Sequence, residues 1–169
     1  MLYVPPIRDY KPFYIQFGDN DAIDIKSAYS VIVKTHDYPA VRKPKDPYKN
    51  DWKDEHGDDE YLGQVFMEAF TFNAECAMFA EDSTGGTAID DLNDGIQTFM
   101  SALSSGEFST YDAWTGFGFQ HVRLSEFKMP SSGDYKAWNG KSRVIFNVEF
   151  KVNDPVTRVV LSNGSIVRR

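Results

Sequence analysis

The sequence is poor in the features that mark several common classes of protein. Its 169 residues contain one cysteine, Cys76, so no disulfide can form within the chain, and a reducing compartment is expected. No apolar run approaches the roughly 20 residues that cross a membrane. Residues 1–6 lack the basic and apolar regions of a signal peptide. We therefore expect no contact with a membrane and assembly in the cytoplasm.

The chain also has fewer basic than acidic residues. Lysine and arginine number 18 against 25 aspartates and glutamates, which gives a net charge of −7. A protein that binds nucleic acid by neutralising phosphates needs the opposite balance, so this class is disfavoured. Aromatic residues, in contrast, make up 15% of the chain. That share suits β structure and broad contact surfaces.

Catalytic and metal-binding patterns are missing as well. The three histidines have no zinc-site spacing, and Lys53 falls where a calcium loop would need an oxygen ligand. His121 and Asp112 could assist a serine, but the chain has no Gly-x-Ser-x-Gly elbow. Residues 84–86, Thr-Gly-Gly, precede a predicted helix without a P-loop lysine, which favours a simple turn. We predict no cofactor, no metal and no enzymatic activity.

Residues 87–106 are predicted to form the main helix. Thr87 is the expected N-cap, two aspartates follow in the first turn, and Gly106 is the expected stop. Gly95 in the middle should cost about 1 kcal/mol relative to alanine, so the helix must depend on packing. One apolar stripe is expected to contain Ile89, Leu92, Ile96, Phe99, Met100 and Leu103.

The other periodic segments alternate as β-strands do. A slip in the alternation near Gln120 and His121 predicts a β-bulge, and Asn163-Gly164 predicts a tight hairpin. The predicted strands are residues 11–17, 24–35, 65–80, 108–111, 117–127, 143–152, 156–161 and 165–167. In residues 65–80, Phe66 is expected to share a face with Phe70. The sequence therefore predicts a mainly β (α+β) single domain over residues 1–169, an antiparallel sandwich or barrel-like sheet with one packed helix.

Two segments are predicted to contact partner chains. Residues 36–61 form a long acidic, proline-containing loop with two aromatic residues, and loops of this length are usually functional or disordered. Residues 156–169 form a C-terminal arm or hairpin that is expected to pair across a subunit boundary. The candidate interface residues are Trp52, Asp54, Glu55, Asp58, Asp59, Tyr61, Arg168 and Arg169.

The order of these elements resembles the tail-tube fold of long-tailed bacteriophages, especially the N-terminal domain of distal tail proteins. A strand at residues 27–34 enters the long loop, which closes on a charged turn with glycine and tyrosine at residues 51–61. The helix end at residues 103–108 precedes Tyr111-Asp112, and the strand at 144–152 stops at Asn-Asp-Pro. The loop glycine, Gly57, stands among acids without the family's usual arginine. The larger C-terminal domain of many relatives is not seen.

The resemblance implies a structural subunit of the virion tail. Such a subunit forms a ring of identical chains, with a hexamer expected, and joins the tail tube to other tail proteins of the baseplate. DNA would pass through the ring without specific binding, along a channel wall that is acidic on balance. Two alternatives stay open. One is another phage assembly protein, such as a tube, tail-terminator or neck subunit. The other is a small β-rich ligand-binding or hydrolytic protein, which would need a deep pocket with converging polar groups.

Overall fold

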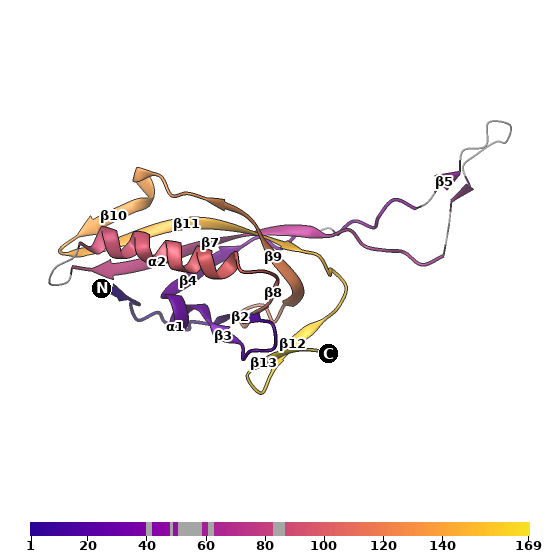
Figure 1. Ribbon diagram of the computed structural model, residues 1–169, viewed down its shortest axis with the longest axis horizontal. Coiled ribbons are helices and arrows are strands. Elements are labelled where there is room, and N and C mark those ends of the chain that lie inside the picture. The colour runs from indigo at the N-terminus through magenta and orange to yellow at the C-terminus, as the bar shows by residue number, and fades with distance from the viewer. Residues whose placement is uncertain (40–41, 48, 51–58, 61–62, 83–86) are drawn as a thin grey trace.

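The chain folds around one antiparallel sheet that curls on itself, as the computed structural model shows (Figure 1). The structure describes residues 1–39, 42–47, 49–50, 59–60, 63–82 and 87–169. The sheet contains β1 (Leu2–Tyr3), β2 (Phe13–Phe17), β3 (Ile23–Asp24), β4 (Val31–His36), β7 (Phe70–Glu81), β8 (Phe108–Asp112), β9 (Gly118–Lys128), β10 (Tyr135–Trp138) and β11 (Lys141–Val152). Their order is β1-β7-β11-β9-β8-β2-β3, with β4 beside β7 and β10 beside β11. The predicted mainly β class with one main helix is confirmed.

The two longest strands, β7 and β11, form the centre of the sheet. They pair from Lys141 opposite Glu81 to Val152 opposite Phe70 without a break in register. Alternate residues of β11 are buried in the core, as the sequence predicted: Val144, Phe146, Val148, Phe150 and Val152. The residues between them face the other side of the sheet, because side chains alternate along a strand.

Helix α2 (Ala88–Leu103) covers the apolar face of this sheet (Figure 1). Thr87 is its N-cap, as predicted, and accepts a hydrogen bond from the backbone N–H of Asp90. The helix ends at Leu103 with Ser104 as C-cap, so the predicted end at Gly106 is wrong. The last turn is closed instead by Ser104, whose backbone N–H donates to the carbonyl of Met100 at 3.0 Å.

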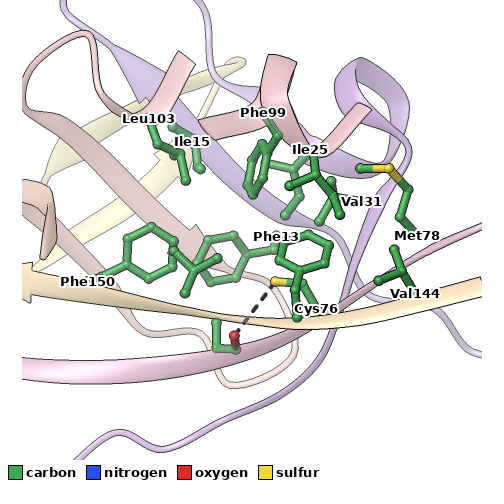
Figure 2. Packing of buried hydrophobic residues seen from close by; sticks show 14 of the residues in the cluster. Phe13, Ile15, Ile25, Val31, Cys76, Met78, Phe99, Leu103, Val144 and Phe150 are labelled. Atoms are coloured by element: carbon green, nitrogen blue, oxygen red, sulfur yellow. Dashed lines mark hydrogen bonds between the residues drawn. The ribbon is translucent and has the colours of Figure 1, made fainter. Parts of the chain in front are cut away.

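The predicted apolar stripe of α2 is mostly correct. Leu92, Ile96, Phe99 and Leu103 are buried, and Phe99 and Leu103 point toward the sheet in Figure 2. Ile89 is 37% exposed, because the stripe begins at the buried Ala88 instead. Met100 is only partly buried at the edge of the stripe.

At Gly95, α2 packs closely against β7 and β1 of the sheet. A Cβ atom at this position would be 2.6 Å from Met78 Sδ and 2.9 Å from Leu2 Cδ1. Met78 is completely buried in β7, so a side chain at position 95 would displace core atoms. The helix therefore carries a glycine at this position despite its low helix propensity.

The predicted strand at residues 24–35 is wrong in its first half. Residues Ile25–Tyr29 form a short helix, α1, capped by Asp24, whose Oδ1 accepts a hydrogen bond from the backbone N–H of Lys26 at 3.0 Å. Ser30 ends it in the left-handed conformation, with φ 57°. Ile25 and Tyr29 share a face at four-residue spacing in a helix and also in a strand. Periodicity could not separate the two structures over so short a segment.

The predicted bulge in β9 is confirmed. Val122 pairs with Phe108 and Phe119 pairs with Thr110, so β9 has one more residue than β8 over the same span. The extra residue is accommodated at Gln120 and His121, where His121 has φ 53°. The strand β10 and the 3-10 turn η1 (Ser132–Asp134) before it were not predicted.

Between β4 and β7, the described residues of the range 37–69 lie in an arm that extends from the body (Figure 1). Its described parts run antiparallel: β5 (Lys49–Asn50) pairs with β6 (Asp59–Glu60), and Pro44 bridges Met67. The backbone N–H of Lys45 also donates to the carbonyl of Phe66 at 2.7 Å. Phe66 is 57% exposed. The prediction that it shares the core face of the next strand is therefore wrong, because β7 begins only at Phe70.

The C-terminal segment is the predicted hairpin. Strands β12 (Val159–Ser162) and β13 (Ser165–Arg168) pair around Asn163 and Gly164. Both turn residues have positive φ, 49° and 78°, as a tight two-residue hairpin requires.

Candidate functional site

The predicted interface residues that the structure describes fall in two places. Trp52, Asp54, Glu55, Asp58 and Tyr61 lie outside the described residues, as do the predicted turn at 84–86 and Gly57. Asp59 belongs to β6 near the outer end of the arm, where its backbone is paired with Asn50. Arg168 and Arg169 lie at the end of the C-terminal hairpin and are exposed. The structure therefore places the described candidates on two separate parts of the surface, the arm and the hairpin (Figure 1).

The hairpin is docked on its own sheet. The backbone N–H of Ala22 donates to the carbonyl of Gly164 at 2.8 Å, and that of Ile166 donates to Gln16 Oε1 at 2.5 Å. Val159 is buried. A Cβ atom on Gly118 of β9 would lie 2.6 Å from Val159 Cγ2. This glycine therefore allows the hairpin to lie directly on β9.

Arg168 takes part in a polar network beneath the hairpin. Its Nε donates to Gln120 Oε1 at 3.2 Å, and Gln120 Nε2 donates to Asp154 Oδ2 at 2.6 Å. Burial raises the pKa of Asp154, but hydrogen bonds from Gln120, Thr157 and Val156 outweigh this and lower the pKa to about 2. The network thus links the end of the chain to the bulge of β9.

The root of the arm is held by a buried cluster of polar and aromatic side chains. His36, the last residue of β4, has Nε2 2.6 Å from Asp112 Oδ2, and only 14% and 5% of the two side chains is exposed. Asp112 also accepts hydrogen bonds from Thr115 Oγ1 at 2.7 Å and from the backbone N–H of Trp114 at 3.0 Å. The ring of Tyr38 stacks 4.1 Å from that of His36. Burial, followed by the nearby Asp112, raises the pKa of Tyr38.

A second set of contacts fixes the next residues of the arm. Arg42 Nη1 donates to the carbonyl of Pro155 at 2.7 Å, and its guanidinium lies 4.7 Å from the ring centre of Phe70. The carboxylate of Asp37 accepts a hydrogen bond from the backbone N–H of Asn73 in β7, and its own N–H donates to the Asn73 carbonyl at 3.1 Å. These contacts anchor the arm where it leaves the body.

Besides the end strands β1 and β3, the sheet has two strand edges without a neighbour among the described residues. β4 pairs with β7 on one side only. On the opposite border, β10 pairs only with β11, and residues 123–128 of β9 likewise pair only with β11. Large apolar side chains are exposed near both edges: Trp114 at 69%, Met129 at 71% and Trp138 at 43%. Open strand edges with exposed apolar residues are sites where another chain can add.

A cavity of about 640 Å³ lies beside the open edge of β4. His36, Asp112 and Thr115 line part of its wall, but they hydrogen-bond to one another and do not converge on the space. The serine-assisting pair considered in the sequence, His121 and Asp112, is not brought together. His121 Nδ1 lies 3.1 Å from Glu107 Oε1 instead.

The His36–Asp112 pair had no signal in the sequence. The two residues are 76 positions apart, and neither belongs to a recognisable motif. From the sequence, Asp112 was considered only beside His121 and as part of Tyr111-Asp112 in the family resemblance, and neither connects it with His36. Only the curling of the sheet, which brings the end of β4 to the end of β8, places the two side chains together.

Cys76 is buried in β7. Burial raises the pKa of its thiol to about 12, so the thiolate is not accessible at neutral pH. Within the described ranges, no group of three histidine, cysteine or acidic side chains is arranged to hold a metal ion. No described helix is long and apolar enough to cross a membrane.

Comparison with known proteins does not assign a function to these residues. The sequence matches no protein-family model and no curated protein.

Proposed function

We propose that this chain is a structural subunit of a bacteriophage or prophage tail, which assembles into a ring that joins the tail tube to the distal tail or baseplate. The observation that carries the proposal is the described part of the arm between β4 and β7, which extends from the curled sheet and is anchored at its root by His36, Tyr38 and Arg42. An extended ribbon held in a defined direction buries little surface in its own chain. It is suited to contact a neighbouring subunit.

The open edges of the sheet support the same proposal. A closed ring requires head-to-tail contacts between two different surfaces of each subunit, repeated through a rotation that closes. The β4 edge and the β9–β10 edge are two such surfaces, on opposite sides of the central β7–β11 pair. The resemblance to distal tail proteins leads us to propose six subunits and a place in the virion tail.

The charge of the sheet limits where a DNA channel can run. On the face opposite α2, the acids Glu75, Glu126 and Glu149 lie among the bases Arg123, Lys128, Arg143 and Lys151, and the register places Glu149 opposite Glu126 and Lys151 opposite Arg123. This face is therefore not predominantly acidic. An acidic wall that lets DNA slide would draw on other surfaces, and the exposed side of α2 carries Asp90 and Asp94.

The proposal is tested by the mass and shape of the assembled protein. The purified full chain, studied by light scattering and electron microscopy at high concentration, should form rings with a central channel. A chain in which residues 50–59 are replaced by a glycine-serine linker of the same length should keep the fold and lose the ring. A strictly monomeric full chain, together with no ring of this chain in the assembled particle, would contradict the proposal.

The second candidate function is that of a structural subunit at another position in the tail. A tube, tail-terminator or neck subunit would use the same open edges, so stoichiometry alone does not distinguish them. Cross-linking in the intact particle does, because a distal subunit should cross-link to baseplate proteins and a neck subunit to head-proximal ones.

A further inference from the structure

We propose that the groove beside β4 binds an extended acidic peptide segment of a partner protein, which adds to β4 as a further strand. This seam groove is the cavity of about 640 Å³ between β4 and residues 7–13. The proposal does not rest on the ring, but the segment would compete with the ring contact proposed above, because both use the β4 edge.

The first step of the argument is the backbone of β4. Its hydrogen bonds to another strand all go to β7 among the described residues, at pairs such as Ile32 with Ala77 and His36 with Ala74. In an antiparallel pair, alternate residues direct their N–H and C=O groups away from the partner. The seam groove lies along β4, lined by each residue from Ile32 to His36, so an incoming strand would meet these groups.

The second step is the boundary of the groove. At one end, His36 and Asp112 meet across the opening, and at the other the chain enters β4 through α1. The far wall is formed by residues 7–13, with Phe13 at the start of β2. Phe13 pairs with Asp112 of β8, while β3 pairs only with Tyr14 and Ile15. The groove is thus a gap in the curled sheet where β4 lacks a neighbour.

The third step is the chemistry of the lining. Ile7 and Trp114 offer apolar surface, being 39% and 69% exposed. A tryptophan beside a pocket is a common anchor in protein interfaces. Three basic side chains, Arg8, Lys11 and Lys34, line the groove with two acids, Asp9 and Asp112. Most of these charges are engaged: Lys34 Nζ lies 2.7 Å from Glu75 Oε1, Arg8 Nε lies 3.7 Å from Asp9 Oδ2, and Asp112 is bound by His36 and Thr115. Lys11 has no acidic partner among the described residues, so its charge favours an acidic group on the incoming segment.

A matched peptide series tests the proposal. The probe is a synthetic peptide of about eight residues, slightly longer than β4, that alternates valine with glutamate. It should bind the full-length protein, measured by isothermal titration, with NMR shifts at Ile32 to Thr35. Replacing two adjacent central residues by proline removes donors on both strand edges and should abolish binding. Exchanging the glutamates for lysines should weaken it at least about fivefold.

Two protein variants locate the site. Lys11→Glu should weaken binding of the acidic peptide at least about fivefold. Lys136→Glu, the same charge change on the exposed strand β10, should leave binding within about twofold, since it lies at the other edge of the sheet. Absence of binding at millimolar peptide, binding unaffected by proline, or equal effects of the two variants would overturn the proposal. A single-stranded oligonucleotide that displaces the peptide and binds more tightly would overturn it in favour of a phosphate backbone.

Discussion

His36 and Asp112 meet across the opening of the curled sheet, with Nε2 of one 2.6 Å from Oδ2 of the other. One residue ends β4 and the other ends β8, so the pair ties together two strands that are not neighbours in the sheet. The arm begins at the next residue, and its direction therefore depends on this contact.

Removing one partner of the His36–Asp112 pair should lower the free energy of unfolding. Asp112→Ala leaves His36 and the donors of Thr115 and Trp114 without their acceptor, and breaking a buried pair of this kind costs about 3–5 kcal/mol of unfolding free energy. Glu107→Ala is the matched control, because it breaks the exposed pair with His121 and should cost less than about 1 kcal/mol. Urea unfolding measures both. Equal losses would contradict a structural role for the buried pair.

The helix stripe gives a second prediction. Phe99 is 1% exposed in the core between α2 and the sheet, so Phe99→Ala should lower the unfolding free energy by about 3–5 kcal/mol. Ile89→Ala on the same helix, where the side chain is partly exposed, should lower it by about 1 kcal/mol or less. A loss below about 1 kcal/mol for Phe99→Ala would show that the stripe does not pack on the sheet as described.

Docking of the C-terminal hairpin should depend on Gly118. A methyl group there would meet Val159 at 2.6 Å, Tyr111 at 2.9 Å and the backbone carbonyl of Thr110 at 3.0 Å. We expect Gly118→Ala to destabilise the protein by about 1–3 kcal/mol and to expose the hairpin to protease. Gly133→Ala, whose nearest such contact is 3.9 Å away, should have little effect. Unchanged thermal unfolding of Gly118→Ala would refute close packing at this point.

The hydrogen-bond network of Arg168, Gln120 and Asp154 predicts that the stability of the fold depends on pH. The pKa of Asp154 is about 2 in the folded protein against an ordinary value of 3.8. Because the folded pKa is the lower one, this carboxylate stabilises the fold above pH 4, and its contribution disappears as the pH falls from about 4 to about 2. The stability difference between the native chain and Asp154→Asn should shrink over this range. A carboxyl resonance titrating near 3.8 in the folded state would contradict the network.

Cys76 should be inert in the native protein. Its thiol is buried and its pKa is raised to about 12, so a thiol reagent at pH 8 should react only after unfolding. The rate of labelling in native buffer and in urea measures this. Rapid labelling without denaturant would mean that β7 is accessible in the folded chain.

Much of the architecture was readable from the sequence because it rests on local periodicity and turn chemistry. The alternation in β11, the Thr87 cap of α2, the bulge at Gln120 and His121, and the Asn163-Gly164 hairpin were each predicted and are each present. In these segments the side-chain pattern matches only one backbone structure. Nothing outside the segment is needed to choose it.

Only the tertiary structure decided the features that depend on distant parts of the chain. Helix α1 was missed because positions 25 and 29 share a face in either backbone structure, and packing of Ile25 into the core selects the helix. Phe66 looked like a core residue but lies in the arm, since the sheet begins only at Phe70. The meeting of His36 with Asp112, the open edge of β4 and the groove beside it follow from the curl of the whole sheet, which no local pattern encodes.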